Sequence, residues 1–330
     1  MLNNQDFTEK RRHFIGGSDI GAILGLNPYK SPVDVWMEKT GKASSQSTNL
    51  AMRFGSFAEE FVASEYALTT GYIVKEPQKT FIHPELTYCK AHLDRLVFDA
   101  LPQNQEIGPS LIPKRILECK TASPFRQDQW GDSGSNQVPF SYLCQCVWYM
   151  AIAELPITDL AVLFGNSDFR IYTIERELEL EIIVLEKANT FWNAHVLKDI
   201  PPDSRSEEDC KKLFEKSSPE KAIEADETVL QMAKEYQALL TQEQAIESGI
   251  DQIKQAFMNV MKDAESIRFN NQELITWKKT KPISRFDGTQ FEIAHPDLYK
   301  QFQKISNGSR RFVFKTNILN HVNAINEGLA

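Results

Sequence analysis

Two carboxylates and a lysine occupy positions in the sequence from which they could share one site. Glu118 and Lys120 are separated by a single residue in the mostly apolar segment 116–121. Because side chains alternate between the two faces of a strand, both are predicted to point to the same side. Asp94 precedes them in another strand-like segment, 88–98, with enough chain in between for a loop and a return strand. Charges on a largely buried strand are costly unless they are paired or bind an ion.

A divalent metal site is the chemistry that these three residues suit best. Two carboxylates provide the oxygen ligands that Mg²⁺ prefers, and such an ion keeps several of its waters. Lys120 could then orient or deprotonate one of those waters. Phosphodiester hydrolysis needs a nucleophilic water and neutralisation of the charge on the transition state, which two divalent ions sharing Asp94 would supply. A buried ion pair at the edge of a sheet explains the same residues equally well, because this spacing is common among unrelated sequences.

Two further residues could lie close to such a metal site. Glu59 falls in a predicted amphipathic helix over 50–69, at the border of its buried stripe, whereas Glu60 points more toward solvent. We expect Glu59 to be an additional carboxylate of the site, with a solvated position on the flank of the helix as the alternative. His92 lies two residues before Asp94, but an ordinary structural histidine is the more common case.

A glycine pair near the start of the chain could hold a phosphate. Gly16 and Gly17 allow close approach of the backbone, and Ser18 or Asp19 could cap the helix that follows. With Arg11 just upstream, such a turn can bind an anion. A tight turn without a ligand is the simpler alternative, and the absence of a following Gly-Lys-Ser/Thr excludes a Walker loop.

A predicted helix over 140–153 carries two polar residues on one face. Tyr142 and Gln145 are three positions apart, so they are neighbours on the helix surface. Gln145 could bond to a phosphate or to the catalytic lysine, and simple packing with one satisfied amide is the alternative. The polar segment 123–138 before this helix is long enough to form a mobile loop at the mouth of a site.

The remaining patterns divide the chain into two domains. Strands are predicted at 79–83, 88–98, 115–121, 160–164 and 169–174, and a helix follows from about residue 178 to about residue 197. Pro201 and Pro202 then open a charged stretch. We therefore assign residues 1–203 to a first domain and residues 204–330 to a helical C-terminal extension with a small β element.

The extension has a helical, highly charged pattern over 219–264. Its 3.5-residue apolar seam slips between Leu240 and Ile246, so a long helix or two packed helices are expected instead of an uninterrupted coiled coil. A hairpin around residues 270–271, a helix over 287–303 and a strand over 311–315 are predicted to follow. Basic residues near the end of the chain could contact DNA or a partner, although a solvated face is the more common role.

Composition excludes several classes of protein. The hydrophobic content of 42% and charged content of 25% are those of an ordinary soluble protein, and no apolar run could span a membrane, so the cytoplasm is the expected location. Five cysteines without a CxxC pair argue against disulfides, zinc and an iron–sulfur cluster. The net charge of −8 disfavours a broad basic DNA-coating surface, but it allows a narrow, locally basic channel.

The motifs, in their order, resemble those of the YqaJ-type phage recombination exonucleases, relatives of phage lambda exonuclease in the PD-(D/E)xK superfamily. The matching stretches lie between residues 10 and 202. They are R-x3-I-G-G-S-D-I from Arg11, N-P-Y-x-S-P from Asn27, W-x-E-K-T-G from Trp36, F-G-x3-E ending at Glu59, His83-Pro84 with Asp94, the strand Leu117–Thr121, and Tyr142-x2-Gln145. One departure is the run around Asp94, which lacks the proline or asparagine often found there in the family.

The resemblance implies a restriction-endonuclease-like three-layer α/β (α+β) core, with a mixed sheet between helices. It also implies an enzyme, a Mg²⁺-dependent exonuclease that digests double-stranded DNA from an end in the 5′-to-3′ direction. Mn²⁺ would substitute, and two ions are expected. Such enzymes leave a 3′ single strand for a phage single-strand annealing protein, and relatives form a trimeric ring around DNA. For a phage- or prophage-encoded protein, the location would be the cytoplasm of the bacterial host.

Roles follow by position from the same resemblance. Asp94 and Glu118 would hold the metals together with the backbone carbonyl of Cys119, while Lys120 would position or activate the attacking water and Glu59 would support the metal site. The remaining motif residues would contact the substrate or the lysine. They are Tyr142 and Gln145, for the phosphate or Lys120, and Arg11 and Ser18, for the 5′ phosphate.

Two other functions remain open from the sequence. A restriction- or repair-type endonuclease could use the same core, and it would cut closed circular DNA that an exonuclease leaves intact. A non-catalytic module that binds DNA ends or proteins is the other alternative, although the intact set of Asp94, Glu118 and Lys120 argues against it.

Overall fold

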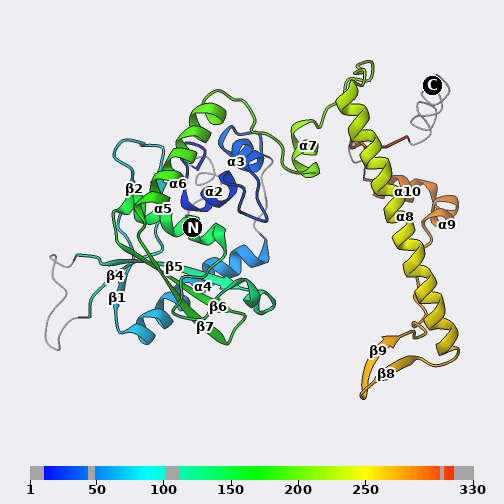
Figure 1. Ribbon diagram of the computed structural model, residues 1–330, viewed down its shortest axis with the longest axis horizontal. Helices are drawn as coiled ribbons and strands as arrows, with labels where there is room; N and C mark the ends of the chain where they lie inside the picture. Colours follow the sequence, from blue (N-terminus) through cyan, green and yellow to red (C-terminus); the bar gives the residue numbers. More distant parts are fainter. Residues whose placement is uncertain (1–10, 44–48, 101–111, 305–307, 316–330) are drawn as a thin grey trace. The chain divides into compact units, whose positions relative to one another are not determined.

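The computed structural model describes residues 11–43, 49–100, 112–304 and 308–315 (Figure 1). The chain forms two compact units, Met1–Phe214 and Glu215–Ala330. The division into a nuclease core at 1–203 and an extension at 204–330 stays a prediction. Among the described residues, no helix is both long and apolar enough to cross a membrane.

A five-stranded mixed sheet forms the centre of the first unit. Its strands are β1 (Ile73–Lys75), β4 (Arg95–Phe98), β5 (Arg115–Ala122), β6 (Ile157–Phe164) and β7 (Asp168–Glu175), in the order β1-β4-β5-β6-β7. Strands β5 and β6 run parallel, and every other neighbouring pair is antiparallel. Helices cover both faces of the central strands, so β6 is buried over nearly its whole length and β5 over its first half.

Helices cover both faces of this sheet and make the unit three layers deep. Helix α4 (Leu50–Thr70) lies on one face, and α2 (Gly17–Ile23), α5 (Phe140–Ala153) and α6 (Leu178–Phe191) lie on the other (Figure 1). Alternation along β5 divides its side chains between two apolar clusters. Leu117 and Cys119 pack with α4, whereas Ile116 packs with α5. The predicted fold class is confirmed, and so is the prediction that Glu118 points away from Leu117 and Cys119, toward α5.

Capping signals explain where several helices begin and end. The side chain of Asn49 accepts a hydrogen bond from Met52 N (2.9 Å) at the start of α4, and Gly71, with a left-handed φ of 73°, ends it. Ser31 starts α3 (Pro32–Lys39) as predicted, and its hydroxyl accepts a hydrogen bond from Asp34 N. Gly165 makes the turn of the predicted hairpin between β6 and β7.

The strand predicted over 88–98 is interrupted, and this difference places a functional residue. Only Lys90–Ala91 (β3, paired with β2, Phe81–Ile82) and Arg95–Phe98 (β4) form strands, and Asp94 lies in the bend between them. The carboxylate of Asp94 accepts a hydrogen bond from Cys119 N (2.9 Å). The bend therefore turns the Asp94 side chain toward β5, which a regular strand would not do.

The first unit is completed by short elements. They are the 3₁₀ turn η1 (Pro124–Gln129), the π-helical turn η2 (Trp192–Val196) and α7 (Glu207–Leu213). Helix α7 is tied to α3, because Lys212 Nζ donates to Asp34 (2.7 Å) and Ser31 Oγ donates to Asp209 (2.6 Å).

The second unit is built on one long helix, α8 (Glu227–Met261), capped by Asp226, whose side chain accepts a hydrogen bond from Val229 N (2.8 Å). The predicted hairpin forms as β8 (Ser266–Phe269) and β9 (Gln272–Thr276). The helix predicted over 287–303 is two helices, α9 (Gly288–Ala294) and α10 (Pro296–Phe302), because Pro296 interrupts the backbone hydrogen bonding.

One prediction for this unit was wrong. Residues 311–315 form no strand within the described part of the chain; instead, Phe312 and Phe314 pack edge-on against the ring of Tyr236, at centroid distances of 6.0 and 4.8 Å. Of the two alternatives for the charged segment 219–264, the long helix is the one that forms, as α8.

Candidate active site

The structure brings Asp94, Glu118, Lys120 and Gln145 together at one place on the α5 side of the sheet. The bend before β4 supplies Asp94, β5 supplies Glu118 and Lys120, and α5 supplies the amide. Lys120 Nζ donates to Glu118 Oε1, and Gln145 Nε2 donates to the same oxygen (2.6 Å). Residues that are far apart in the sequence therefore converge on Glu118.

Glu118 carries an unusual feature for a buried side chain. It is 1% exposed, and within the described residues its second oxygen, Oε2, has no hydrogen-bond partner. A buried polar atom without a partner costs free energy, and a charged oxygen costs more. A cation beside Oε2 would remove that cost.

Charges in this site shift the pKa values of their neighbours. Burial, and then the charge of Glu118, raise the pKa of Asp94 to about 7, because two close carboxylates resist ionising together. Burial alone would lower the pKa of Lys120, but Glu118 and Asp94 outweigh that effect and raise it. Lys120 therefore keeps its proton at neutral pH in this arrangement and can donate to a water or a phosphate oxygen.

The donor set fits a hard divalent cation that keeps most of its waters. Within the described ranges, no three His, Cys, Asp or Glu side chains lie close enough together to form a cage of their own. Mg²⁺ does not need one, since it binds through one or two carboxylates and retains water. The Cys119 thiol does not face this site, because its side chain packs toward α4, and burial raises its pKa.

Glu59 reaches the same region from the opposite face of the sheet. Arg95 donates to Glu59 Oε1 (2.8 Å), to the Asp94 carbonyl (2.6 Å) and to the exposed Glu60 (2.7 Å). Burial, followed by the charge of Asp94, raises the pKa of Glu59, which indicates that the two carboxylates are electrostatically coupled. Arg95 is a functional candidate that the sequence reasoning missed. The signal was available, because it follows Asp94 directly inside a strand.

Tyr142 lies beside the lysine, which is one of the two contacts that the family resemblance implied. Its ring is centred 5.6 Å from Lys120 Nζ, within the range of a cation–π contact. The ring of Trp130 stacks on the ring of Tyr142, with a centroid-to-centroid distance of 5.3 Å. The loop 123–138 therefore contributes a side chain that holds Tyr142 in place.

A second polar site surrounds the glycine pair. A cavity of about 110 Å³ is lined by Arg11, Phe14, Gly16, Gly17, Ser18, His92 and Tyr149. Arg11 donates to Ser18 Oγ (2.7 Å), so the two residues expected to bind a phosphate are in contact. Of the two predicted caps, Ser18 was wrong, because it lies inside the helix. Gly16 is the N-cap residue of α2, and the Asp19 side chain caps it from the third helical position by accepting a hydrogen bond from Gly16 N (3.1 Å).

Asp19 organises the cations around this cavity. It is fully buried and accepts hydrogen bonds from Lys39 (2.6 Å) and Lys30 (3.1 Å), with Arg11 at 3.7 Å. Burial opposes ionisation of Asp19, but Lys39, Lys30 and Arg11 together lower its pKa. One negative charge thus holds three positive ones at the edge of the cavity.

Tyr149 joins the two sites. Its hydroxyl accepts a hydrogen bond from Gln145 Nε2 (2.8 Å), the amide that also donates to Glu118, and its ring lines the small cavity. His92 lies in that cavity, packed at 5.2 Å against Phe14, and its pKa is lowered by burial and by the charges of Arg11 and Lys90. The sequence reasoning missed Tyr149 and considered His92 only as a neighbour of the metal.

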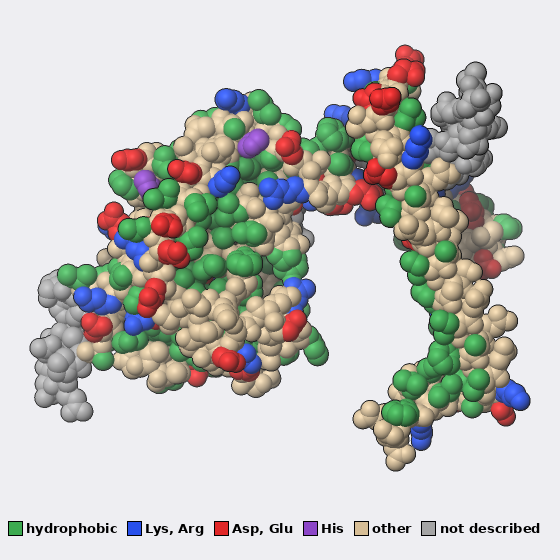
Figure 2. Space-filling view, viewed as in Figure 1, with side chains coloured by type: hydrophobic (Ala, Val, Ile, Leu, Met, Phe, Trp, Pro, Cys, Tyr) green, Lys and Arg blue, Asp and Glu red, His purple; other side chains and the backbone are tan. Residues whose placement is uncertain are grey.

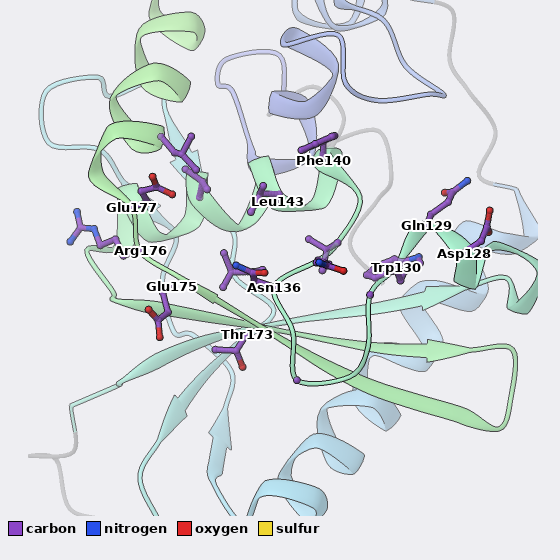
Figure 3. Close-up of a pocket in the computed structure, with 17 residues that line it drawn as sticks. Asp128, Gln129, Trp130, Asn136, Phe140, Leu143, Thr173, Glu175, Arg176 and Glu177 are labelled. Carbon is purple, nitrogen blue, oxygen red and sulfur yellow. The ribbon is translucent and has the colours of Figure 1, made fainter.

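A cavity larger than the one beside the glycine pair lies elsewhere in the unit. It has a volume of about 900 Å³ and is lined by the loop 128–138, by α5 and by the segment 173–180 (Figure 3). None of Asp94, Glu118, Lys120 and Gln145 lines it. The candidate active site therefore rests on the convergence of charged groups on Glu118 and not on this cavity.

Comparison with known proteins identifies relatives over most of the chain. The YqaJ-like viral recombinase domain matches residues 6–156. The chain is 30% identical over 321 residues to the uncharacterized protein YqaJ of Bacillus subtilis (strain 168), and the match covers 95% of each protein.

Two solved structures match the chain at low identity. An alkaline exonuclease, LHK-Exo, from Laribacter hongkongensis is 18% identical with a TM-score of 0.46, and the match covers 59% of this chain and 94% of that one. A putative exonuclease from Eubacterium rectale is 14% identical with a TM-score of 0.41, and the match covers 68% of this chain and 96% of that one.

Proposed function

Because the chain belongs to the YqaJ-like viral recombinase family, we propose that it is a metal-dependent deoxyribonuclease that digests double-stranded DNA from an end. The observation that carries the proposal is the buried, unpartnered Oε2 of Glu118, next to Asp94 and the protonated Lys120. Among the described residues only three buried side-chain atoms lack a partner, and Glu118 Oε2 is the one that belongs to a carboxylate, for which the cost is highest. A cation bound beside Glu118 Oε2 would offset the free-energy cost of burying this oxygen.

Asp94, Glu118 and the Cys119 carbonyl would hold Mg²⁺, with Mn²⁺ as a substitute and two ions as the expected number. When bound, the metal neutralises charge on the scissile phosphate and lowers the pKa of its water. Lys120 then donates a hydrogen bond to that water or to a phosphate oxygen, in line with its contact to Glu118. Gln145 fixes the Glu118 carboxylate, and Tyr142 fixes the position of Lys120.

Glu59 supports Asp94 indirectly. Arg95 links the Glu59 carboxylate to the Asp94 main chain, so this pair sets the bend that aims Asp94 toward β5. The coupling between Glu59 and Asp94 also means that a metal bound at Asp94 would ease ionisation of Glu59.

Recognition of an end is assigned to Arg11 and Ser18. Both line a cavity of about 110 Å³, and the Arg11 guanidinium can form a charge-assisted hydrogen bond with a phosphate oxygen. A 5′ phosphate held there would favour digestion in the 5′-to-3′ direction and leave a 3′ single strand. A single-strand annealing protein of phage-type recombination would use that strand. We further propose that three copies of the chain form a homotrimeric ring and that the enzyme acts in the cytoplasm of a bacterial host.

Digestion of linear and closed circular duplex DNA with and without Mg²⁺ tests the proposal. We expect the linear duplex, labelled at its 5′ end, to release the label first and only with the metal, and the circle to stay intact. Cleavage of the circle would establish the endonuclease alternative. Absence of metal-dependent cleavage of either substrate would refute the nuclease.

A further inference from the structure

A buried ion pair lies next to the small cavity that Arg11 lines. Lys39 Nζ donates to Asp19 Oδ2 (2.6 Å), and the two side chains are 1% and 0% exposed. Neither residue lines the cavity itself. A buried ion pair is weak evidence for stability, because the cost of removing two charges from water often exceeds their mutual attraction. The contacts that the pair makes with other residues are therefore the better guide to its role.

Those contacts lead to the residues around the cavity. The Asp19 carboxylate also accepts hydrogen bonds from Gly16 N (3.1 Å) and from Lys30 Nζ (3.1 Å). Lys39 Nζ donates a second hydrogen bond, to the Arg11 carbonyl (3.0 Å). Arg11 and Gly16 both line the cavity. The pair thus connects the last residue of α3 to the segment that forms one wall of the cavity.

Arg11 is held at its main chain and at its side chain. Lys39 binds the carbonyl, and the guanidinium Nη2 donates to Ser18 Oγ (2.7 Å) and lies 3.7 Å from Asp19 Oδ1. The Arg11 side chain is 38% exposed, so without these contacts it could adopt many rotamers. Fixing a long side chain before the ligand arrives lowers the entropic cost of binding. The arrangement therefore prepares Arg11 for a ligand.

The charged groups of this cluster leave a surplus of one positive charge. The cations are Arg11, Lys30 and Lys39, and the carboxylates are Asp19 and Glu38, which accepts a hydrogen bond from Lys30 Nζ (2.6 Å). Burial raises the pKa of Asp19, but Lys39, Lys30 and Arg11 lower it by more, so Asp19 is ionised at neutral pH. Elsewhere on the face of the first unit shown in Figure 2, Lys and Arg side chains are scattered among Asp and Glu. A terminal phosphate would therefore be attracted by a local cluster such as this one.

We propose that Asp19 and Lys39 are positioning residues that set the preference of the enzyme for a phosphorylated 5′ end. They hold the Arg11 guanidinium at the cavity, and neither of them touches the phosphate. This role rests on the proposed function, in which Arg11 binds the 5′ phosphate. Recognition of the phosphate then depends on a buried pair outside the cavity, because without the pair the Arg11 side chain keeps only its contact with Ser18.

Positioning and simple electrostatics predict different effects for this pair. As a negative charge Asp19 repels a phosphate, so electrostatics alone predicts that its removal strengthens binding of every DNA end. As the anchor of Arg11, Asp19 is needed for the preference for a phosphorylated end. Removal of Asp19 and Lys39 together leaves the net charge unchanged. Electrostatics alone then predicts no effect, whereas loss of positioning lowers the preference.

Binding of a DNA hairpin to the full-length protein measures this preference. The hairpin has one open end, carries either a 5′ phosphate or a 5′ hydroxyl there, and is labelled in its loop for fluorescence anisotropy. A chelator is present, so that metal-dependent cleavage does not occur. We expect wild type to bind the phosphorylated end about tenfold more tightly or better, the effect of one hydrogen bond to a charged group. Arg11→Gln should lose this preference.

The Asp19→Asn/Lys39→Met variant tests the positioning role. It removes both charges of the pair and leaves neither partner buried alone, so it should fold. We expect its affinity for the hydroxyl end to stay within about twofold of wild type and its preference for the phosphate to fall about fivefold. A general structural defect would instead lower both affinities together. Thermal unfolding checks the fold, and Asp19→Asn alone replaces the double variant if that protein does not fold.

Glu38→Gln is the matched control for Asp19→Asn. Both substitutions remove one carboxylate of the cluster and raise the net charge by one. Within the described residues, however, the Glu38 carboxylate bonds to Lys30 and makes no hydrogen bond to Arg11. Both variants should bind the hydroxyl end as tightly as wild type or more tightly, and Asp19→Asn alone should lose the preference for the phosphate.

The outcomes separate the positioning role from the functions on which it rests. A folded double variant with the wild-type preference, when Arg11→Gln has lost it, would overturn the positioning role and leave recognition by Arg11 intact. An equal loss of preference in Glu38→Gln would overturn it as well, since the net charge would then be the cause. No preference in wild type would refute phosphate binding by Arg11 together with the positioning role. Because only binding is measured, each result is independent of nuclease activity.

Discussion

At the scale of single residues, the site is a balance of charges around Glu118. The Lys120 ammonium and the Gln145 amide both donate to Glu118 Oε1. The other oxygen, Oε2, is buried without a partner among the described residues. The neighbouring Asp94 resists ionisation. Burial of these charges lowers the free energy of unfolding, and a bound cation would offset that loss.

Replacing Lys120 by alanine should abolish cleavage and leave DNA binding intact. The ammonium group is the donor placed beside Glu118 and Tyr142, and loss of a group that positions or activates a water lowers rates about 100-fold or more. Initial rates and a gel-shift titration measure the two effects. Exposed Lys114 is the control, since Lys114→Ala should behave as wild type. Unchanged cleavage in Lys120→Ala would remove the assigned role.

Asp94 predicts a pH dependence of stability in metal-free protein. Its pKa rises from 3.8 in the unfolded chain to about 7 in the fold, so folding favours the protonated form. The stabilisation is present below about pH 4 and is lost as the pH rises to 7, at most about 4 kcal/mol at 1.4 kcal/mol per pKa unit. Urea unfolding with a chelator should show this loss in wild type relative to Asp94→Asn. Parallel pH profiles for the two proteins would contradict the shift.

At the scale of elements, the sequence predicted the parts with a clear period or end signal. The strand carrying Glu118, the cap at Ser31 and the hairpin at Gly165 followed from alternation and turn chemistry. The bend at Asp94 could not be predicted, because it depends on the Cys119 amide, which lies on a strand formed later in the chain. The same holds for Tyr149, whose contacts are set by the packing of α5 against α2.

Helix α2 packs closely against α5 at Gly17. A Cβ at Gly17 would lie 2.5 Å from the Tyr149 ring, so α2 and α5 can approach only because this residue is glycine. Gly17→Ala should destabilise the first unit by about 1–3 kcal/mol and reduce cleavage, because Tyr149 must move away from Gln145. Thermal unfolding and initial rates measure both.

Gly55→Ala provides the matched control for that substitution. Gly55 also lies in a helix, but an added Cβ would meet only Thr121 Oγ1 at 3.8 Å, an ordinary contact. Alanine should be tolerated there or stabilise by about 1 kcal/mol through helix propensity. Equal effects of the two substitutions would show that the contact with Tyr149 does not limit α2.

At the scale of the whole molecule, all residues placed in the nuclease site belong to the first unit. Between Leu213 and Glu227 the chain forms neither helix nor strand, and its side chains are largely exposed. The described part of the second unit contributes the long helix α8 and the hairpin β8–β9, and none of the residues placed in the nuclease site lies there. The proposed chemistry is thus assigned to the first unit alone.

Limited trypsin digestion should cut first in this connecting segment, at Lys216 or Lys221. Exposed backbone without regular hydrogen bonding is the preferred site of proteolysis. The digested protein should retain metal-dependent cleavage of linear DNA, because the site residues all precede the cut. Loss of cleavage on cutting, with the first unit still folded by circular dichroism, would place part of the active site in the second unit.

Anomalous diffraction from crystals grown with Mn²⁺ would locate the proposed metal. We predict a peak within ligand distance of Asp94, Glu118 and the Cys119 carbonyl, about 2.0–2.4 Å from their oxygens, and loss of that peak in Glu118→Gln. A fully loaded crystal with no peak at Glu118, or with Asp94 turned away from it, would contradict the account.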